Sequence, residues 1–207
     1  MTKKGLLLAT TNQGKIKEIK DYLEELSLEI VTLEELSPKP IFVEKGQTFL
    51  ENARGKSLYY SQRHPLLTLA EDSGLEIEYL KGAPGVFSSR FSGAQATDER
   101  NIRKVLKLMK GVPLEKRKAQ FVSCLVLAAE GKTIKEIRES VKGIITFEKK
   151  GNYGFGYDPI FFYPPLKKTF AELLPAEKNS VSHRGRALKK LKAFLLLYLE
   201  SEKKSKV

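Results

Sequence analysis

The segment Leu6-Leu7-Leu8-Ala9-Thr10-Thr11-Asn12-Gln13-Gly14-Lys15 decides the fold, because an apolar run passes directly into a polar turn. A short apolar run bounded by turn residues is typical of a buried strand. The apolar residues from Ile16 to Leu26 then recur at the spacing of one helix face, and the run Ile30–Leu33 indicates a second strand. The chain therefore opens with a β-α-β unit, which indicates an α/β fold.

Further helices and strands are expected along the rest of the chain. Thr48 and Glu51 have the spacing of a capping box, in which each side chain bonds the other's backbone N–H, and this predicts a helix over 49–62. The apolar run 66–70 predicts a buried strand that delivers Glu71-Asp72-Ser73-Gly74 at its carboxyl end. The later patterns predict a helix over 97–109, a strand over 121–127, one or two strands over 133–147 and a last helix from Ser182.

Length and composition exclude several classes of protein. The 207 residues favour one large domain or two interlocked lobes, and a 41% hydrophobic content lets the chain bury a core. The longest apolar run, Ala193–Leu199, is far shorter than the ~20 residues that cross a bilayer. The first apolar stretch is too short for a signal peptide, so we expect a soluble cytoplasmic protein. The lone Cys124 excludes an internal disulfide.

The net charge of +12 attracts polyanions in general. It does not by itself choose among nucleic acid, anionic surfaces and nucleotide phosphates. More than half of the positive excess lies in residues 178–207. We expect residues 1–200 to form a single α/β domain and residues 201–207 to be a mobile basic tail.

The turn Thr10–Lys15 has the position of an anion-binding site. Where a strand passes into a helix, free backbone N–H groups and the helix dipole attract phosphate. The turn is not a P-loop, because Ile16 stands where a Ser or Thr would hold magnesium. An ordinary polar loop would have the same composition, so this turn alone does not decide the function.

Acidic residues are the second candidate feature, namely Glu44, Glu51 and the pair Glu71-Asp72. Carboxylates gathered on one spot repel each other unless they share a cation, and Mg2+ favours one or two carboxylates together with phosphate oxygens. Turn and cap chemistry is the alternative, and it explains Glu51 better. Lys56 lies between apolar positions of its predicted helix, so beside Lys15 it would neutralise phosphate, although a helical lysine is usually solvated.

An aromatic and glycine-rich segment, Gly151–Pro159, is the third candidate feature. Glycines allow close approach to a flat ligand and aromatic rings stack on bases, although a hairpin with aromatic packing would look the same. Lys178 and the sequence Ser182-His183-Arg184-Gly185 place donors before the last helix, where His183 is otherwise explained as a cap residue.

Taken together, these segments resemble the inosine/xanthosine triphosphate pyrophosphatases, which hydrolyse non-standard purine nucleoside triphosphates. The resemblance covers nearly the whole chain and rests on six segments in the family's order: Thr10–Lys15, Phe49–Ala53, Glu71–Leu75, Gly82–Arg90, Gly154–Pro159 and Ser182–Gly185. One position departs from the pattern, because many bacterial relatives have Asp where this chain has Glu71. That difference leaves open whether Glu71 binds metal directly or through water.

The resemblance implies a fold and an activity. The fold would be an elongated two-lobed α/β domain, with a long mixed central β-sheet flanked by helices and an active-site cleft between the lobes. The protein would be a homodimer that uses Mg2+ to convert ITP, dITP and XTP to the monophosphate and pyrophosphate. A membrane or a specific nucleic acid is not an expected partner, and the basic charge would serve the nucleotide.

Carried over position by position, the resemblance also implies roles for individual residues. Asp72 would be the general base, and Lys15 and Lys56 would hold the phosphates as further catalytic residues. The metal would be bound by Glu44, Glu71 and Asp72. The substrate would be bound by Thr10, Thr11, Asn12, Gln13, Gly14, Lys15, Ser73, Phe155, Gly156, Tyr157, Asp158, Lys178, His183 and Arg184.

Two other functions remain open at this point. A nucleic-acid-binding module would use the basic C-terminal helix and the aromatic segment, but it leaves Glu44, Glu71 and Asp72 unexplained. A pyrophosphatase for another nucleotide, such as a modified pyrimidine, would share the acidic and basic residues and differ in the base site.

Overall fold

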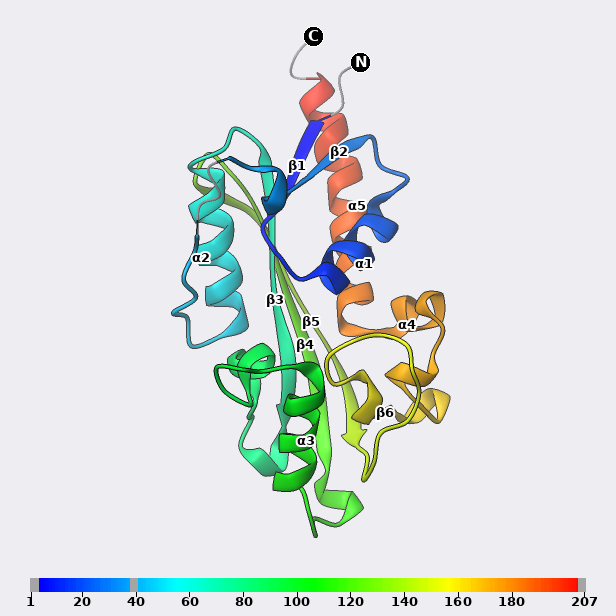
Figure 1. Ribbon diagram of the computed structural model, residues 1–207. Helices are drawn as coiled ribbons and strands as arrows, with labels where there is room; N and C mark the ends of the chain where they lie inside the picture. Colours follow the sequence, from blue (N-terminus) through cyan, green and yellow to red (C-terminus); the bar gives the residue numbers. More distant parts are fainter. Residues whose placement is uncertain (1–3, 38–40, 205–207) are drawn as a thin grey trace.

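The computed structural model describes residues 4–37 and 41–204, which form a mixed sheet with helices on both faces (Figure 1). The seven strands are ordered β2-β1-β3-β4-β5-β6-β7. β1 pairs in parallel with β2 and β3, whereas the pairs from β3 to β7 are antiparallel. The elements are β1 (Lys4–Leu8), α1 (Gln13–Leu23), β2 (Leu28–Thr32), α2 (Phe49–Ser61), β3 (Leu67–Ile77), α3 (Asp98–Leu108), β4 (Lys118–Ala129), β5 (Lys132–Ile145), β6 (Phe161–Tyr163), β7 (Lys168–Thr169), α4 (Pro175–Val181) and α5 (His183–Lys204).

The opening β-α-β unit is confirmed, with β2 beginning somewhat earlier than expected. Asn12 ends the turn after β1 and caps α1, because its side chain accepts a hydrogen bond from the backbone N–H of Lys15 at 3.0 Å. Ile16, Ile19 and Leu23 form the buried stripe of α1, as their spacing predicts. The cap therefore places Lys15 in the first turn of a helix that is docked on the sheet.

The long strands β3, β4 and β5 connect the two halves of the molecule. The expectation that β3 ends at Ala70 is wrong, because the strand continues through Glu71-Asp72-Ser73-Gly74 to Ile77. The reason is an unbroken antiparallel ladder with β4, from Thr68 opposite Ala128 to Ile77 opposite Ala119. β1 pairs only with the first part of β3, up to Leu8 opposite Leu69. The segment 82–88 bonds to the same side of β3 from Leu75 onward, so only a short stretch around Asp72–Gly74 faces the cavity.

Two apolar cores, one at each end of these strands, make the two lobes visible in Figure 1. In the first lobe, α1 and α5 pack together on one face of the sheet through residues such as Ile19, Leu127 and Leu191. α2 covers the opposite face there, where Phe49 and Ala53 contact β4. In the second lobe, α3 packs with the far part of β3 and with aromatic residues of β4, β6 and the segment 170–173. The elongated two-lobed α/β architecture with a mixed sheet is therefore confirmed.

Two predicted details at helix ends need correction. The capping box of α2 is only half formed, because Thr48 accepts from Glu51 N at 3.2 Å, while the Glu51 carboxylate accepts from Gln47 N at 2.8 Å. Residues 201–204 belong to α5 and not to a tail. Lys4 holds this end of the helix, since its ammonium pairs with Glu202 and lies 4.8 Å from the ring centroid of Tyr198. The rest of the expected tail, 205–207, lies outside the described residues.

None of the helices in residues 4–37 and 41–204 has the length and apolar character that a membrane crossing requires.

Candidate active site

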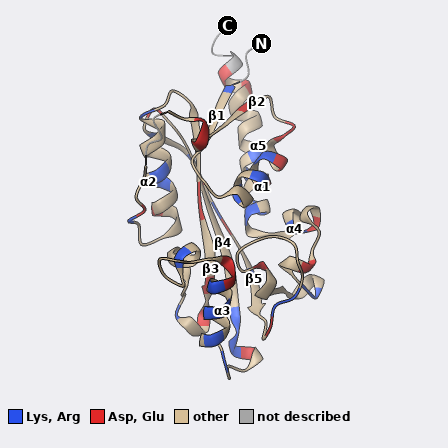
Figure 2. Ribbon diagram, viewed as in Figure 1, with Lys and Arg blue, Asp and Glu red and all other residues tan. Residues whose placement is uncertain are grey.

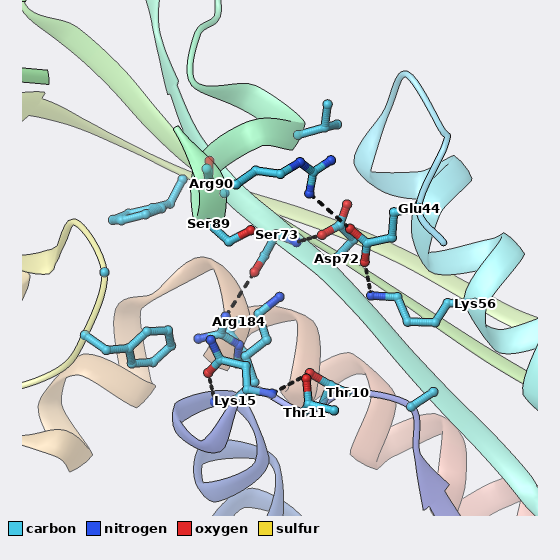
Figure 3. Close-up of a pocket in the computed structure, with 18 of the residues that line it drawn as sticks. Thr10, Thr11, Lys15, Glu44, Lys56, Asp72, Ser73, Ser89, Arg90 and Arg184 are labelled. Atoms are coloured by element: carbon cyan, nitrogen blue, oxygen red, sulfur yellow. Dashed lines mark hydrogen bonds and ion pairs between the residues drawn. The ribbon is translucent and has the colours of Figure 1, made fainter. Parts of the chain in front are cut away.

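A cavity of about 810 Å³ opens beside β3, at the level where β1 has ended (Figure 3). Its wall is built from the turn after β1, residues 41–44, β3, the short 3-10 helix Gly85–Arg90, the segment 155–158 and the start of α5. The predicted site residues that it brings together are Thr10, Thr11, Asn12, Lys15, Glu44, Lys56, Asp72, Ser73, Phe155, Gly156, Tyr157, Asp158, Lys178, His183 and Arg184.

Asp72 is the carboxylate in the middle of this wall. Asn52 of α2 donates to its Oδ2 at 3.0 Å, and the backbone N–H of Ser73 donates to its Oδ1 at 3.1 Å. Burial raises the pKa of Asp72; Lys15 opposes this shift and Glu44 adds to it. The ionised carboxylate is thus oriented by two donors and is a stronger base than an exposed aspartate.

Glu44 lies across from Asp72 and is held by cations. Its carboxylate pairs with the ammonium of Lys56, and Arg90 Nη1 lies 3.7 Å from its Oε2. Burial by itself would raise the pKa of Glu44, but Lys56, with Lys15 and Arg90, keeps it below its ordinary value. Lys56 also donates to the Glu71 carbonyl at 3.3 Å, so it spans the space between the segment 41–44 and β3.

Lys15 reaches into the same space from the first turn of α1 (Figure 3). Burial lowers the pKa of Lys15, and Glu71 and Asp72 partly offset that effect. Within residues 4–37 and 41–204, no acceptor forms a hydrogen bond with its ammonium. This lysine therefore keeps its donors available for an anionic ligand.

Glu71 does not line the cavity, and its predicted role as a metal ligand does not fit the structure. Adjacent residues of a strand point to opposite faces, so Asp72 faces α2 while Glu71 faces α5. Both Glu71 carboxylate oxygens accept from Arg184 Nε, at 2.8 and 2.9 Å, and Oε1 also accepts from Ser123 at 3.0 Å. Arg184 outweighs the effect of burial and holds the pKa of Glu71 far below its ordinary value. Glu71 is therefore the internal counter-ion of Arg184.

Arg184 and Lys178 belong to a buried network of ion pairs that continues from Glu71. Glu18 of α1 joins the two cations, pairing with Arg184 and, at 2.9 Å, with Lys178. Lys178 also pairs with Asp158 at 2.6 Å. Arg184 keeps one contact toward the cavity, a 3.0 Å hydrogen bond from Nη2 to Ser73 Oγ.

The segment 155–158 covers this network with an aromatic ring. The Phe155 ring centroid lies 4.7 Å from Lys178 Nζ and 5.3 Å from Arg184 Cζ, both within cation–π range. Asp158 closes the turn by accepting from Phe155 N at 2.9 Å. On the other side, Gly156 N donates to Asp98 of α3 at 2.7 Å. The segment is thus attached to both lobes.

His183 is buried and stacks on Phe121, with ring centroids 4.7 Å apart and planes 10° apart. Burial lowers its pKa well below the ordinary value, so the imidazole is neutral. Among the described residues, its Nδ1 has no hydrogen-bond partner. A neutral imidazole in the cavity wall can serve a ligand as donor on one nitrogen and acceptor on the other.

Two of the predicted substrate-binding residues lie outside the cavity lining. The side chain of Gln13 is exposed and donates to Glu34 at 3.0 Å. Gly14 lies under the Phe155 ring, where a Cβ atom would come within 2.7 Å of a ring carbon. Gly14 therefore contributes the space that Phe155 occupies.

Four further wall or supporting residues were not singled out from the sequence, namely Glu18, Asn52, Arg90 and Asp98. Glu18 had a usable signal, because it follows Lys15 by one helical turn and so shares its face. Asn52 and Arg90 stand within the segments that carry the family resemblance, but their roles depend on contacts between distant segments. From the sequence, Asp98 is explained as an acidic residue in the first turn of a helix. Its hydrogen bond with Gly156 N could not be predicted, because the two residues are far apart in the chain.

The donors at the cavity suit a metal that binds together with its substrate. Among the described residues, no three His, Cys, Asp or Glu side chains form a ready metal cage. Asp72 and Glu44 offer two carboxylates at the open side, and Mg2+ characteristically combines one or two carboxylates with water and substrate phosphate oxygens. The raised pKa of Asp72 indicates a carboxylate that a nearby cation would stabilise.

The fold and cavity define an α/β protein with a cleft that offers cations, carboxylates and a flat aromatic wall to one ligand. A family model described as "Ham1 family" matches residues 6–194. This chain belongs to the Ham1 family.

Several known proteins are similar to this chain over almost its whole length. The chain is 44% identical to the dITP/XTP pyrophosphatase of Desulforamulus reducens, over 95% of this chain and 98% of that protein. It is 43% identical to the dITP/XTP pyrophosphatase of Bacillus subtilis, over 93% and 97%. Among solved structures, a HAM1 protein from Coxiella burnetii superposes with a TM-score of 0.84 at 39% identity, covering 93% of this chain and 98% of that one.

Proposed function

We propose that this protein hydrolyses the non-standard purine nucleoside triphosphates ITP, dITP and XTP to the monophosphate and pyrophosphate. The observation that carries the proposal is the position of Asp72 in one cavity with Lys15 and Lys56. A base and two cations in one wall are what the hydrolysis of a phosphoanhydride requires. The names of the similar proteins support the substrate class.

Mg2+ is the cofactor in this proposal, with Asp72 and Glu44 as its protein ligands. When bound, it supplies positive charge at the phosphate oxygens and positions the leaving group. Lys15 and Lys56 bind the polyphosphate chain, and the turn Thr10–Asn12 adds polar donors beside them. The open arrangement of the two carboxylates supports this assignment.

Asp72 is the general base. Its ionised carboxylate takes a proton from the attacking water, whose oxygen forms the new P–O bond as the bond between the α- and β-phosphates breaks. The hydrogen bonds from Asn52 and Ser73 N hold the carboxylate in one orientation. Its raised pKa brings its basicity closer to that needed at neutral pH.

The purine lies against Phe155, with its polar edge toward Lys178, His183 and Arg184. Hydrogen-bond donors at this position can bind the 6-oxygen of hypoxanthine or xanthine, which is an acceptor. The 6-amino group of adenine is itself a donor, so adenine would be bound poorly. Because Glu18, Glu71 and Asp158 fix the two cations, the donor positions are set before the substrate arrives. This pre-organisation supports selection by the base.

Asp72→Asn tests the proposal. We expect kcat for ITP to fall by about 10²–10⁴, the usual contribution of a general base, with little change in folding. Pyrophosphate release in the presence of Mg2+ is the measurement, and Asp21→Asn, on the exposed side of α1, is the matched control with normal activity. Near-normal turnover of Asp72→Asn would contradict the assignment.

A nucleotide panel separates the remaining alternatives. If the wild-type protein releases pyrophosphate from ITP, dITP and XTP and much less from ATP and GTP, the proposed substrate class is correct. A preference for a modified pyrimidine triphosphate would replace it with the second alternative. Figure 2 shows Lys and Arg on α1, α2, α3 and α5 alike, so the positive charge is not confined to the C-terminal helix that a nucleic-acid module would use.

We further propose that the protein acts as a cytoplasmic homodimer. The substrate class supports the location, because nucleotide pools are cytoplasmic. An apolar surface supports the dimer, since the Phe87 side chain is 57% exposed beside a hollow that includes Leu50 and Pro84. Sedimentation equilibrium should give twice the chain mass of 23.4 kDa, and a monomer mass would contradict the dimer.

A further inference from the structure

We propose that Arg90 binds the pyrophosphate half of the substrate, reaching the phosphates from the lobe opposite Lys15. In the structure its guanidinium contacts Glu44, and we infer that the β- and γ-phosphates take over as its partners when a nucleotide is bound. This inference rests on the proposed function and adds a substrate-binding residue to it.

The backbone that carries Arg90 is held firmly. Arg90 ends the 3-10 helix Gly85–Arg90, which lies against β3. Ser88 fixes this helix, because its hydroxyl donates to Gly85 O at 2.6 Å and accepts from Leu75 N at 3.0 Å. The Ser88 carbonyl in turn accepts from Tyr157 OH at 2.8 Å. Only the side chain of Arg90 is therefore free to change partner.

The Arg90 guanidinium points into the cavity toward the acidic edge, where Glu44 and Asp72 lie (Figure 3). Its side chain is 43% exposed. The ion pair with Glu44, at 3.7 Å, is longer than a hydrogen bond, and the Phe87 ring centroid lies 5.2 Å from the guanidinium carbon. Within residues 4–37 and 41–204, no acceptor forms a hydrogen bond with the Arg90 side chain. Arg90 thus keeps most of its N–H donors available to a ligand.

The other arginine of the cavity differs in this respect. Arg184 is buried and gives its donors to Glu71, Glu18 and Ser73 at hydrogen-bond distance. A guanidinium presents five donors in a planar fork that matches phosphate oxygens two at a time. Arg184 gives three of its five donors to these acceptors, whereas Arg90 gives none to an acceptor at hydrogen-bond distance among the described residues, so Arg90 has a whole fork available for such a contact.

The charge of the substrate also leaves a place for a further protein cation beside the proposed Mg2+. A nucleoside triphosphate carries several negative charges, while Lys56 is already matched by Glu44 in the structure. Lys15 and Lys56 both belong to the first lobe, on α1 and α2. Arg90 comes from the second lobe, so the polyphosphate chain would be held from both sides of the cavity.

Measuring the binding of the two products, pyrophosphate and IMP, distinguishes direct phosphate binding by Arg90 from a structural role. We expect Arg90→Ala to raise the inhibition constant of pyrophosphate against ITP hydrolysis by about 10- to 100-fold, the range for a hydrogen-bonded charge. The inhibition constant of IMP should change by less than about twofold. Arg90→Lys, which keeps the charge and loses the fork, should fall between. Calorimetric titration of the protein with pyrophosphate alone gives the same comparison without turnover.

Arg103→Ala is the matched control. Arg103 lies on α3 of the same lobe with its side chain 76% exposed, and its removal changes the net charge equally. Its inhibition constants should equal those of the wild type. Added guanidinium ions should restore pyrophosphate binding to Arg90→Ala and have no such effect on Arg103→Ala.

Several outcomes would overturn the inference. Unchanged pyrophosphate binding in Arg90→Ala would exclude the contact, and equal weakening of IMP and pyrophosphate would show that Arg90 acts through the shape of the cavity. If Arg90→Ala does not fold, the same comparison is made with Arg90→Lys. The proposed function is judged separately, by whether the wild-type protein releases pyrophosphate from ITP in the same assay.

Discussion

Two groups of charged residues lie beside β3, and they use their charges differently. The buried cluster consists of Glu18, Glu71, Asp158, Lys178 and Arg184, and each of its members pairs closely with another. The open cluster consists of Lys15, Glu44, Lys56, Asp72 and Arg90, which line the cavity. Lys56 pairs closely with Glu44, whereas Lys15, Asp72 and Arg90 have no ion pair at hydrogen-bond distance among the described residues.

This difference indicates that the buried cluster holds the structure of the site and that the open cluster takes part in the proposed reaction. In the buried cluster, neighbouring charges hold the pKa of Glu71 and Glu18 low, so these carboxylates are ionised and fixed. Burial raises the pKa of Asp158, but its ion pair with Lys178 opposes that shift. In the open cluster, burial raises the pKa of Asp72 and lowers that of Lys15, so both groups lose stability when charged. A phosphate ligand with its cation would remove that cost. Charged side chains that lack a close partner thus indicate the side of the site where the substrate would react.

The largest effect is expected in a comparison of the stability of Glu71→Ala with that of Asp72→Ala. Removing Glu71 leaves Arg184 buried without its main partner, so the free energy of unfolding should fall by about 3–5 kcal/mol. Removing Asp72 takes away a carboxylate that burial destabilises but leaves the buried Asn52 amide without its acceptor, so the loss should be smaller, about 1–2 kcal/mol. Urea unfolding at pH 7 measures both.

An equal loss of stability in the two variants would break the distinction between the clusters. Glu71→Gln sharpens the test, because it keeps the shape and removes only the charge. Its stability should lie between those of the wild type and Glu71→Ala.

The second prediction concerns the pH dependence of the buried cluster. Burial alone would raise the pKa of Glu18, but Arg184 and Lys178 lower it below its ordinary value of 4.5. The folded state therefore binds this proton less readily than the unfolded state. The contribution of Glu18 to stability is complete above the unfolded pKa and is lost as the pH falls through the lowered folded pKa.

Glu18→Gln should show this loss directly. At pH 7 its free energy of unfolding should be about 1–3 kcal/mol below that of the wild type, and the two should converge as the pH is lowered below 4.5. Thermal or urea unfolding at a series of pH values gives the difference. A difference that is independent of pH would mean that Glu18 acts through packing and not through its charge.

The smallest effects are expected for the adjacent residues Gly14 and Gln13. Gly14→Ala places a Cβ against the Phe155 ring, so it should raise KM for ITP by about tenfold. Gln13→Ala removes an exposed contact to Glu34 and should leave KM within about twofold. Steady-state kinetics decides between them. A large effect of Gln13→Ala would place that side chain at the substrate after all.

Local patterns predicted most of the elements. The polar turn before α1, the stripe of α1, the start of α2 at Phe49 and the start of the last helix all follow from short-range rules. The end of β3 did not follow, because the strand continues through Glu71 and Asp72 as long as β4 pairs with it. Pairing partners lie far away in the sequence, so the length of such a strand is not a local property.

In the candidate site, too, the features set by neighbouring residues could be predicted, and those set by contacts between distant segments could not. The types of residue that bind phosphate and metal can be recognised in the sequence, and their roles stay predictions. Which carboxylate faces the cavity depends on the alternation along β3, and this separates Asp72 from Glu71. The contacts of Glu18 with Lys178 and Arg184 join α1 to residues of α4 and α5, and no spacing rule reveals them.

The three long strands also determine how a nucleotide can enter. β3, β4 and β5 run through both lobes as paired strands, with a single register shift between β4 and β5 at Leu127/Ala128, so a hinge between the lobes would have to bend this sheet or break its bonds. The sheet itself therefore opposes a rigid-body closure of the lobes. Enclosure of the nucleotide would instead require movement of a cavity segment that belongs to no helix or strand, such as residues 41–44.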